Sequence, residues 1–171
     1  MPLEPTIIDL PSFTVAGLSA RFIGAMSPDA NNQQIIPPLW QAFDALLPDL
    51  IAAGDAPHPT EFWGLCRFLS PAERSRDDEL EYMAGVRLDR IDALPAGATT
   101  WEVPAARYAR FTHRGPIARL CETLGYVYGT WFPRSEYEPL FAMELEHYDD
   151  RFKLDAEDSE LDCYVGLRAR G

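Results

Sequence analysis

Positive charge is scarce in this sequence. Its 171 residues include 15 Lys and Arg against 27 Asp and Glu, which gives a formal net charge of −12. A chain with this balance is repelled by the phosphates of nucleic acids and by anionic lipid surfaces. No uninterrupted apolar run approaches the roughly 20 residues that a transmembrane helix needs. The sequence therefore predicts no direct nucleic-acid partner and no membrane partner.

Paired cysteines and the common cofactor motifs are also missing. The three cysteines, Cys66, Cys121 and Cys163, are odd in number and show no paired spacing, so no disulfide framework is expected. The first residues have no basic segment followed by an apolar one, which predicts a cytoplasmic protein with reduced thiols. No histidine falls in a metal-ligand spacing, and no glycine-rich phosphate loop or GxSxG motif occurs. We therefore expect neither a metal nor a cofactor.

What the sequence does contain is an internal repeat. The segments 79–87 and 160–168 align at an offset of 81 residues, with four identical positions. The same offset relates two apolar stripes at helical spacing, one over 39–51 and one over 117–131. Pro37 and Pro38 suit the first turn of the first helix. Each predicted helix follows a strand-like segment, 13–22 or 107–112, and precedes another, 62–68 or 141–148.

These elements predict an α+β fold in which each half has the order β-α-β-β. The whole chain, 1–171, is interpreted as a single domain. Its first repeat covers about 5–90 and its second about 98–170, with a Pro- and Gly-containing linker over 90–99. A charged connection, 70–78, joins two strands of the first half.

Strand alternation suggests which side chains share a face. In segment 141–148, we expect the apolar side chains of Phe141, Met143 and Leu145 to cover the helix. Glu144, Glu146 and Tyr148 then point away from it. Half-one residues expected on that same outer surface include Trp63 and Met83. One interpretation is a pocket for a cationic or aromatic ligand, because aromatic faces attract cations. The alternative is that Glu144 and Glu146 belong to a solvated sheet face.

Ordered segments along nearly the whole chain resemble the GyrI-like small-molecule-binding family. This family includes effector-binding domains of AraC-type and MerR-type transcription regulators. The resemblance implies two βαββ (SH2-like) units, related by pseudo-twofold symmetry, with antiparallel sheets, one long helix each and a ligand cleft between them. The resembling segments are 11–17, 82–86, 103–109, 113–116, 128–135 and 145–149.

The resemblance also implies a ligand and a site. Family members bind lipophilic, often cationic, aromatic compounds, and a glutamate in the motif matched here by Leu145-Glu146-His147-Tyr148 recognises the cation. This assigns ligand binding to Glu146. Tyr82 matches a family aromatic, although alternation sends it toward the helix side. The further expected walls of the cleft are Trp63, Met83, Trp131 and Tyr164.

The function predicted in this way is that of a stand-alone binder of lipophilic, cationic or planar aromatic small molecules, acting in toxin or drug protection. No helix-turn-helix domain is expected, because the binding domain fills the chain. One alternative is a cofactor-free hydrolase that opens reactive cyclopropane-bearing genotoxins, with Glu146 as its catalytic acid or base. Another is an inhibitor of DNA gyrase, a topoisomerase, through direct protein contact.

Overall fold

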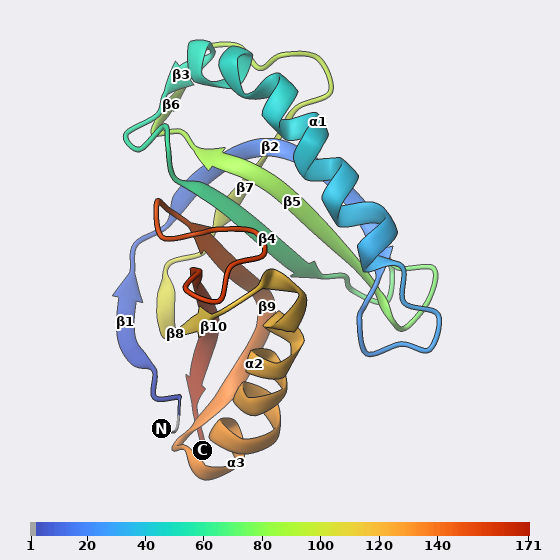
Figure 1. Ribbon diagram of the computed structural model, residues 1–171, viewed down its shortest axis with the longest axis vertical. Helices are drawn as coiled ribbons and strands as arrows, with labels where there is room; N and C mark the ends of the chain where they lie inside the picture. Colours follow the sequence, from blue (N-terminus) through green and yellow to red (C-terminus); the bar gives the residue numbers. More distant parts are fainter. Residues whose placement is uncertain (1–2) are drawn as a thin grey trace.

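One large antiparallel sheet organises the molecule. The computed structural model describes residues 3–171; Met1 and Pro2, part of the segment searched for a signal sequence, lie outside the described residues. Eight strands form the sheet in the order β1-β8-β10-β9-β4-β5-β2-β7 (Figure 1). They are β1 (Thr6–Leu10), β2 (Phe13–Ile23), β4 (Phe62–Phe68), β5 (Glu79–Arg87), β7 (Thr99–Val103), β8 (Ala106–Arg114), β9 (Tyr137–Tyr148) and β10 (Glu160–Ala169).

The predicted α+β class with an antiparallel sheet is confirmed. β4 and β9 are neighbours at the middle of the sheet and pair antiparallel, with Leu65 opposite Leu145. Each edge strand pairs with a strand from the other half of the chain. β1 pairs with β8, and β7 pairs with β2. β3 (Gly54–Asp55) and β6 (Arg90–Ile91) form a separate two-stranded pair, and β6 lies at the start of the segment expected to be a linker. The twofold SH2-like repeat remains a prediction.

Helix α1 (Asn32–Ala52) starts earlier than the sequence suggested. Pro37 and Pro38 lie inside the helix and not in its first turn. Proline lacks a backbone N–H, so each removes one intrahelical hydrogen bond. The helix persists because its apolar stripe is anchored by tertiary packing, with Phe43 and Leu50 buried against β2 and β5.

The second helical segment is interrupted. It begins as a 3₁₀ turn, η1 (Ile117–Arg119), and continues as α2 (Leu120–Tyr126). It then widens into a π turn, η2 (Val127–Trp131), and ends as α3 (Phe132–Arg134). The regular α-helix ends one residue after Gly125, a residue type that weakens helices. Cys121, which lies within the apolar stripe of the second predicted helix, is exposed. No helix of the described residues is long and apolar enough to cross a membrane.

Both faces of the sheet are covered. Helix α1 lies over the half that contains β2 and β5, and the second helical segment lies over the half that contains β9 and β10 (Figure 1). On the opposite face, side chains from strands near both ends of the sheet pack against one another in a single core. Its buried members are Val15, Leu65, Met83, Val103, Tyr108, Met143, Leu145 and Tyr164.

Candidate ligand-binding site

A carboxylate lies at the centre of the sheet on its helix side. Oε2 of Glu146, on β9, accepts hydrogen bonds from the hydroxyls of Tyr82 and Tyr148, each at 2.6 Å. Tyr82 comes from the neighbouring half of the sheet, on β5. Nε1 of Trp40, on α1, donates to the Tyr82 hydroxyl at 3.3 Å. The Trp40 ring also packs edge-on against the Tyr148 ring, with centroids 5.0 Å apart. The Glu146 cluster, defined as Glu146, Tyr82, Tyr148 and Trp40, therefore connects α1 to the middle of the sheet.

A glycine leaves the room that this cluster occupies. Gly64, on β4, is the register partner of Glu146. A Cβ atom at this position would lie 2.0 Å from the Tyr82 hydroxyl and 2.6 Å from Oε2 of Glu146. Any side chain here would force the Tyr82–Glu146 hydrogen bond to rearrange, because real Cβ contacts of that length do not occur.

Burial controls the protonation of the cluster. Loss of solvation raises the pKa of Glu146 above its ordinary value, and the two tyrosine hydrogen bonds counteract only part of that effect. Burial, together with the negative charge of Glu146, raises the pKa of Tyr82 and Tyr148 well above the ordinary value. Both tyrosines are therefore neutral hydrogen-bond donors at physiological pH.

A second carboxylate stands beside the first. Glu144 lies two residues earlier on β9 and on the same face, where the hydroxyl of Tyr128 from the π turn donates to it. Burial raises the pKa of Glu144, and the charge of Glu146 adds to the effect. The Tyr128 ring is nearly parallel to that of Phe141, with centroids 6.2 Å apart, and Phe141 is 63 % exposed. Aromatic side chains thus extend from this carboxylate to the surface.

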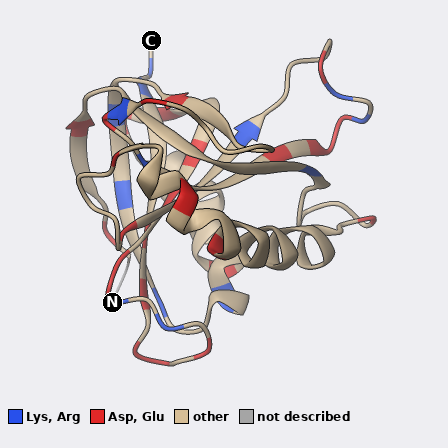
Figure 2. Ribbon diagram, turned by 90° about the horizontal axis from the view of Figure 1, so that it is seen from above, with Lys and Arg blue, Asp and Glu red and all other residues tan. Residues whose placement is uncertain are grey.

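Positive charge is absent from the walls around the two carboxylates. Among the described residues, neither Glu144 nor Glu146 forms an ion pair, and α1, α2, the π turn and β9 contain no Lys or Arg (Figure 2). Arg67, on the adjacent strand β4, and Arg87, on β5, project from the other face. There Arg67 pairs with Glu81 and Arg87 pairs with Asp89.

The predicted orientation of β9 was wrong. Met143 and Leu145 point away from the helices, whereas Glu144, Glu146 and Tyr148 point toward them. The prediction assumed that the apolar side of the strand must cover a helix. In this sheet the apolar side instead joins the core that the strands close among themselves, so apolar character does not identify the helix face.

The expected site residues separate into two groups. Tyr82 hydrogen-bonds Glu146. Trp63, Met83 and Tyr164 belong to the core on the other face, where Trp63 packs against Phe13 with ring centroids 4.9 Å apart. Trp131 is the last residue of the π turn, and its ring centroid lies 5.2 Å from that of Phe111. The structure therefore does not bring these four residues together with Glu146.

Sequence reasoning did not select Trp40, Tyr128, Glu144 or Tyr148 as site residues. For Tyr148 and Glu144 a signal existed, because each is two positions from Glu146 on one strand and must share its face. Trp40 and Tyr128 were assigned only to apolar helical stripes. Through tertiary packing, Trp40 donates to the Tyr82 hydroxyl and Tyr128 donates to Glu144, which the spacing within a helix cannot reveal.

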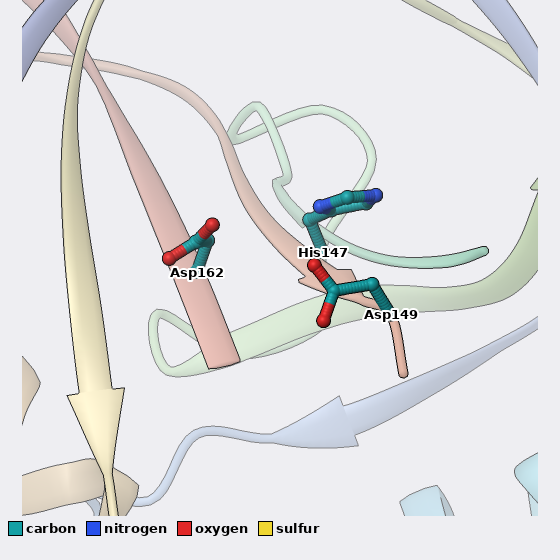
Figure 3. Close-up of side chains that lie close together, drawn as sticks. All are labelled: His147, Asp149 and Asp162. Atoms are coloured by element: carbon teal, nitrogen blue, oxygen red, sulfur yellow. The ribbon is translucent and has the colours of Figure 1, made fainter. Parts of the chain in front are cut away.

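A second acidic cluster lies on the opposite face. His147, Asp149 and Asp162 bring potential metal-ligand atoms within 4.8 Å of one another (Figure 3). The guanidinium of Arg151, however, donates to Asp149 and to Asp162, at 2.7 Å each. Thr112 donates to Asp162 at 2.6 Å. An internal cation thus already compensates these carboxylates, and the arrangement has the features of a structural ion-pair network.

Two shallow surface hollows lie elsewhere, with volumes of about 300 and 380 Å³. The first is between α2 and β8, and the second is beside Trp131 and the start of β9. Neither is bordered by Glu144 or Glu146, and neither has a buried carboxylate among its lining residues. We therefore centre the candidate site on the Glu146 cluster, where charge and aromatic rings converge.

Comparison with known proteins agrees with this architecture. The transcriptional regulator BrlR of Pseudomonas aeruginosa is 27 % identical over 167 residues, which cover 96 % of this chain and 56 % of BrlR. The structure of SAV2435 bound to tetraphenylphosphonium has a TM-score of 0.72 at 18 % identity, with 97 % of this chain and 94 % of that chain covered. An integron cassette protein from the mobile metagenome of Vibrio cholerae has a TM-score of 0.61 at 17 % identity, covering 96 % of both chains.

The family model of the Cass2 proteins, described as integron-associated effector binding proteins, matches residues 6–167. This match includes all of the sheet except the last two residues of β10, and it includes both carboxylates of the candidate site. The chain is therefore a member of the Cass2 family of integron-associated effector binding proteins, a family of small-molecule-binding domains.

Proposed function

We propose that this protein binds lipophilic cations and that Glu146 supplies the counter-charge. The observation that carries the proposal is the composition of the Glu146 cluster. A carboxylate is enclosed by the rings of Trp40, Tyr82 and Tyr148, with only neutral hydroxyls as partners and no basic side chain around it. A negative charge without a buried counter-ion is costly, and a cation that brings its own apolar surface removes that cost.

The aromatic rings favour the same ligand class. The face of an aromatic ring attracts a cation by about 0.5–2 kcal/mol, depending on how far the pair is desolvated. The bound tetraphenylphosphonium of SAV2435 is a lipophilic cation of this kind, and its similarity in fold supports the proposal for this chain. The biological role that follows is capture of toxic cationic compounds, as a form of drug or toxin protection.

Entry of a ligand requires side-chain movement. The two tyrosine hydroxyls occupy one oxygen of Glu146, and Trp40 covers the Tyr82 hydroxyl from α1. We propose that the tyrosines hold the carboxylate when no ligand is bound and that the Trp40 ring moves to contact an entering cation. Because Trp40 is in direct contact with the cluster, its fluorescence should report binding.

The test is a fluorescence titration with two ions of the same shape and opposite charge. Tetraphenylphosphonium should bind and change the tryptophan emission, whereas tetraphenylborate should not. Glu146→Gln should weaken phosphonium binding by about tenfold or more, because about 1.4 kcal/mol of charge attraction is lost. Glu102→Gln removes the same charge from the exposed edge strand β7 and should leave binding unchanged. Unaltered affinity in Glu146→Gln would contradict the proposed role.

A second candidate function rests on the raised pKa of Glu146. A carboxyl group whose pKa is raised by burial keeps its proton to a higher pH than an exposed one and can act as a general acid, as a hydrolase that opens cyclopropane-bearing compounds would need. Incubation with an activated cyclopropane substrate distinguishes the two functions. Ring-opened product that accumulates beyond one equivalent, and disappears in Glu146→Gln, supports the hydrolase. Stoichiometric binding without product supports the binder.

A further inference from the structure

We propose that the site selects dications, specifically planar aromatic molecules with two cationic centres, one beside Glu146 and the other beside Glu144. This inference rests on the proposed function and deepens it, because it assigns a second recognition residue and a narrower ligand class. It begins from the spacing of the two carboxylates along β9.

Glu144 and Glu146 form a pair with a defined separation. They are two residues apart on one strand, so both project from the helix side and their Cα atoms are about 6.6 Å apart. Different elements hold them in place. Tyr82 and Tyr148, from the sheet, donate to Glu146, and Tyr128, from the π turn, donates to Glu144. Each carboxylate has its own neutral donors, so the two can be matched to two separate ligand charges.

The charge balance favours a ligand with two positive charges. One cation beside Glu146 leaves Glu144 without a counter-charge in the same enclosed region, because α1, α2 and the π turn contain no Lys or Arg. Glu144 must then either remain as a costly buried charge or take up a proton. A second cationic centre on the ligand removes both penalties, and this difference is the source of the expected selectivity.

Aromatic surface is available next to both carboxylates. Trp40 lies beside the tyrosines of Glu146. At the other end, the ring of Phe141 is nearly parallel to that of Tyr128 and meets the ring of Phe68 edge-on at 5.7 Å. Phe141 is also one of the few large apolar side chains left exposed. A planar aromatic ligand lying along β9 would contact aromatic rings at each of its charged ends.

The experiment compares two probes that share a shape and differ in charge. Methyl viologen is a bipyridinium dication with one charged nitrogen in each ring. N-methyl-4-phenylpyridinium has the same two-ring outline and only one charged nitrogen. Isothermal titration calorimetry at constant ionic strength should show that the unmodified protein binds the dication about tenfold more tightly or better. Equal affinity for the two probes would overturn the inference without the need for any variant.

Substitutions then locate the source of the preference. Glu144→Gln should remove the preference for the dication while changing monocation affinity less than about threefold. Glu146→Gln should weaken both probes, and Glu102→Gln should change neither. A preference that survives in a folded Glu144→Gln protein, with folding checked by urea unfolding, would overturn the role of Glu144. If the two probes and tetraphenylphosphonium all fail to bind, the proposed function itself fails. If monocations bind through Glu146 with no dication preference, only the present inference fails.

Discussion

The two faces of the sheet carry acidic clusters that differ in how their charge is compensated. On one face, Arg151 binds Asp149 and Asp162 as an internal cation. On the other, Glu144 and Glu146 have only tyrosine hydroxyls. The first arrangement is complete within the protein and stabilises the connection between β9 and β10. The second leaves negative charge without a protein cation. Both clusters contain carboxylates, so residue types do not separate them. What distinguishes a structural network from a candidate binding site is whether the protein itself supplies a cation to the carboxylates.

Removing the internal cation should have the largest effect on stability. Arg151→Met leaves Asp149 and Asp162 without their guanidinium, and Asp162 is a buried residue. We expect the free energy of unfolding to fall by about 2 kcal/mol, which is less than the roughly 3–5 kcal/mol for a fully buried pair because Arg151 itself is partly exposed. Urea unfolding measures this. A loss below about 0.5 kcal/mol would show that the network is not structural, and cation binding at the other face should remain intact.

Filling the space at Gly64 should be the next largest effect. Gly64→Ala places a methyl group against the Tyr82 hydroxyl and Oε2 of Glu146. We expect a loss of about 1–3 kcal/mol in stability, as for other overpacked cores, together with weaker binding of tetraphenylphosphonium. Gly129→Ala is the matched control, because nothing lies within 4 Å of a Cβ there. Equal effects of the two substitutions, in unfolding and in titration, would contradict the packing assigned to the cluster.

Neutralising Glu146 should have a smaller, opposite and pH-dependent effect on stability. Because burial raises the pKa of Glu146, the folded protein holds its proton more tightly than the unfolded chain does. This contribution to stability is fully present below the ordinary carboxyl pKa and is lost as pH rises through the raised value. Glu146→Gln should therefore stabilise the protein by about 1 kcal/mol at pH 8 and by much less at pH 4.

The measurement for Glu146→Gln is urea unfolding at both pH values. Glu102→Gln, on the exposed edge strand, provides the baseline. The glutamine oxygen can still accept the Tyr82 and Tyr148 hydrogen bonds, since both meet one oxygen of the carboxylate. A destabilised Glu146→Gln protein at pH 8 would show that the carboxylate is a structural group, comparable to Asp162, and would remove the contrast between the two faces.

Much of the architecture could be predicted from local patterns. The segments 62–68 and 79–87 were predicted with the bounds that β4 and β5 have, because alternation and turn residues delimit them. The beginnings of α1 and β9 were predicted too late, since the first turns of α1 and the residues from Tyr137 onward have no regular apolar pattern. The π turn was not predicted, although Gly125 indicated a weakness close to it.

The candidate site was likewise predicted only in part. Glu146 could be selected from its motif, and Tyr82 from a family resemblance. Trp63, Met83 and Tyr164 were associated with Glu146 only because β9 was assigned the wrong face. Successive side chains on a strand alternate between its two faces. Assigning the wrong face therefore gives every residue of the strand the wrong predicted contacts. No pattern in this part of β9 could correct this, because from Met143 to Tyr148 neither of its faces is exposed.

By itself, the sequence determined that this chain forms an antiparallel α+β domain with excess negative charge and a glutamate in a recognisable motif. Periodicity, turn residues and composition are local properties, and local properties suffice for those conclusions. Only the tertiary structure decided that Glu144 and Glu146 face the helices, that tyrosines from three separate segments donate to them, and that Arg151 compensates the acids on the other face. The physical reason is that charge compensation depends on which segments meet in space, and here those segments are up to 64 residues apart in the chain.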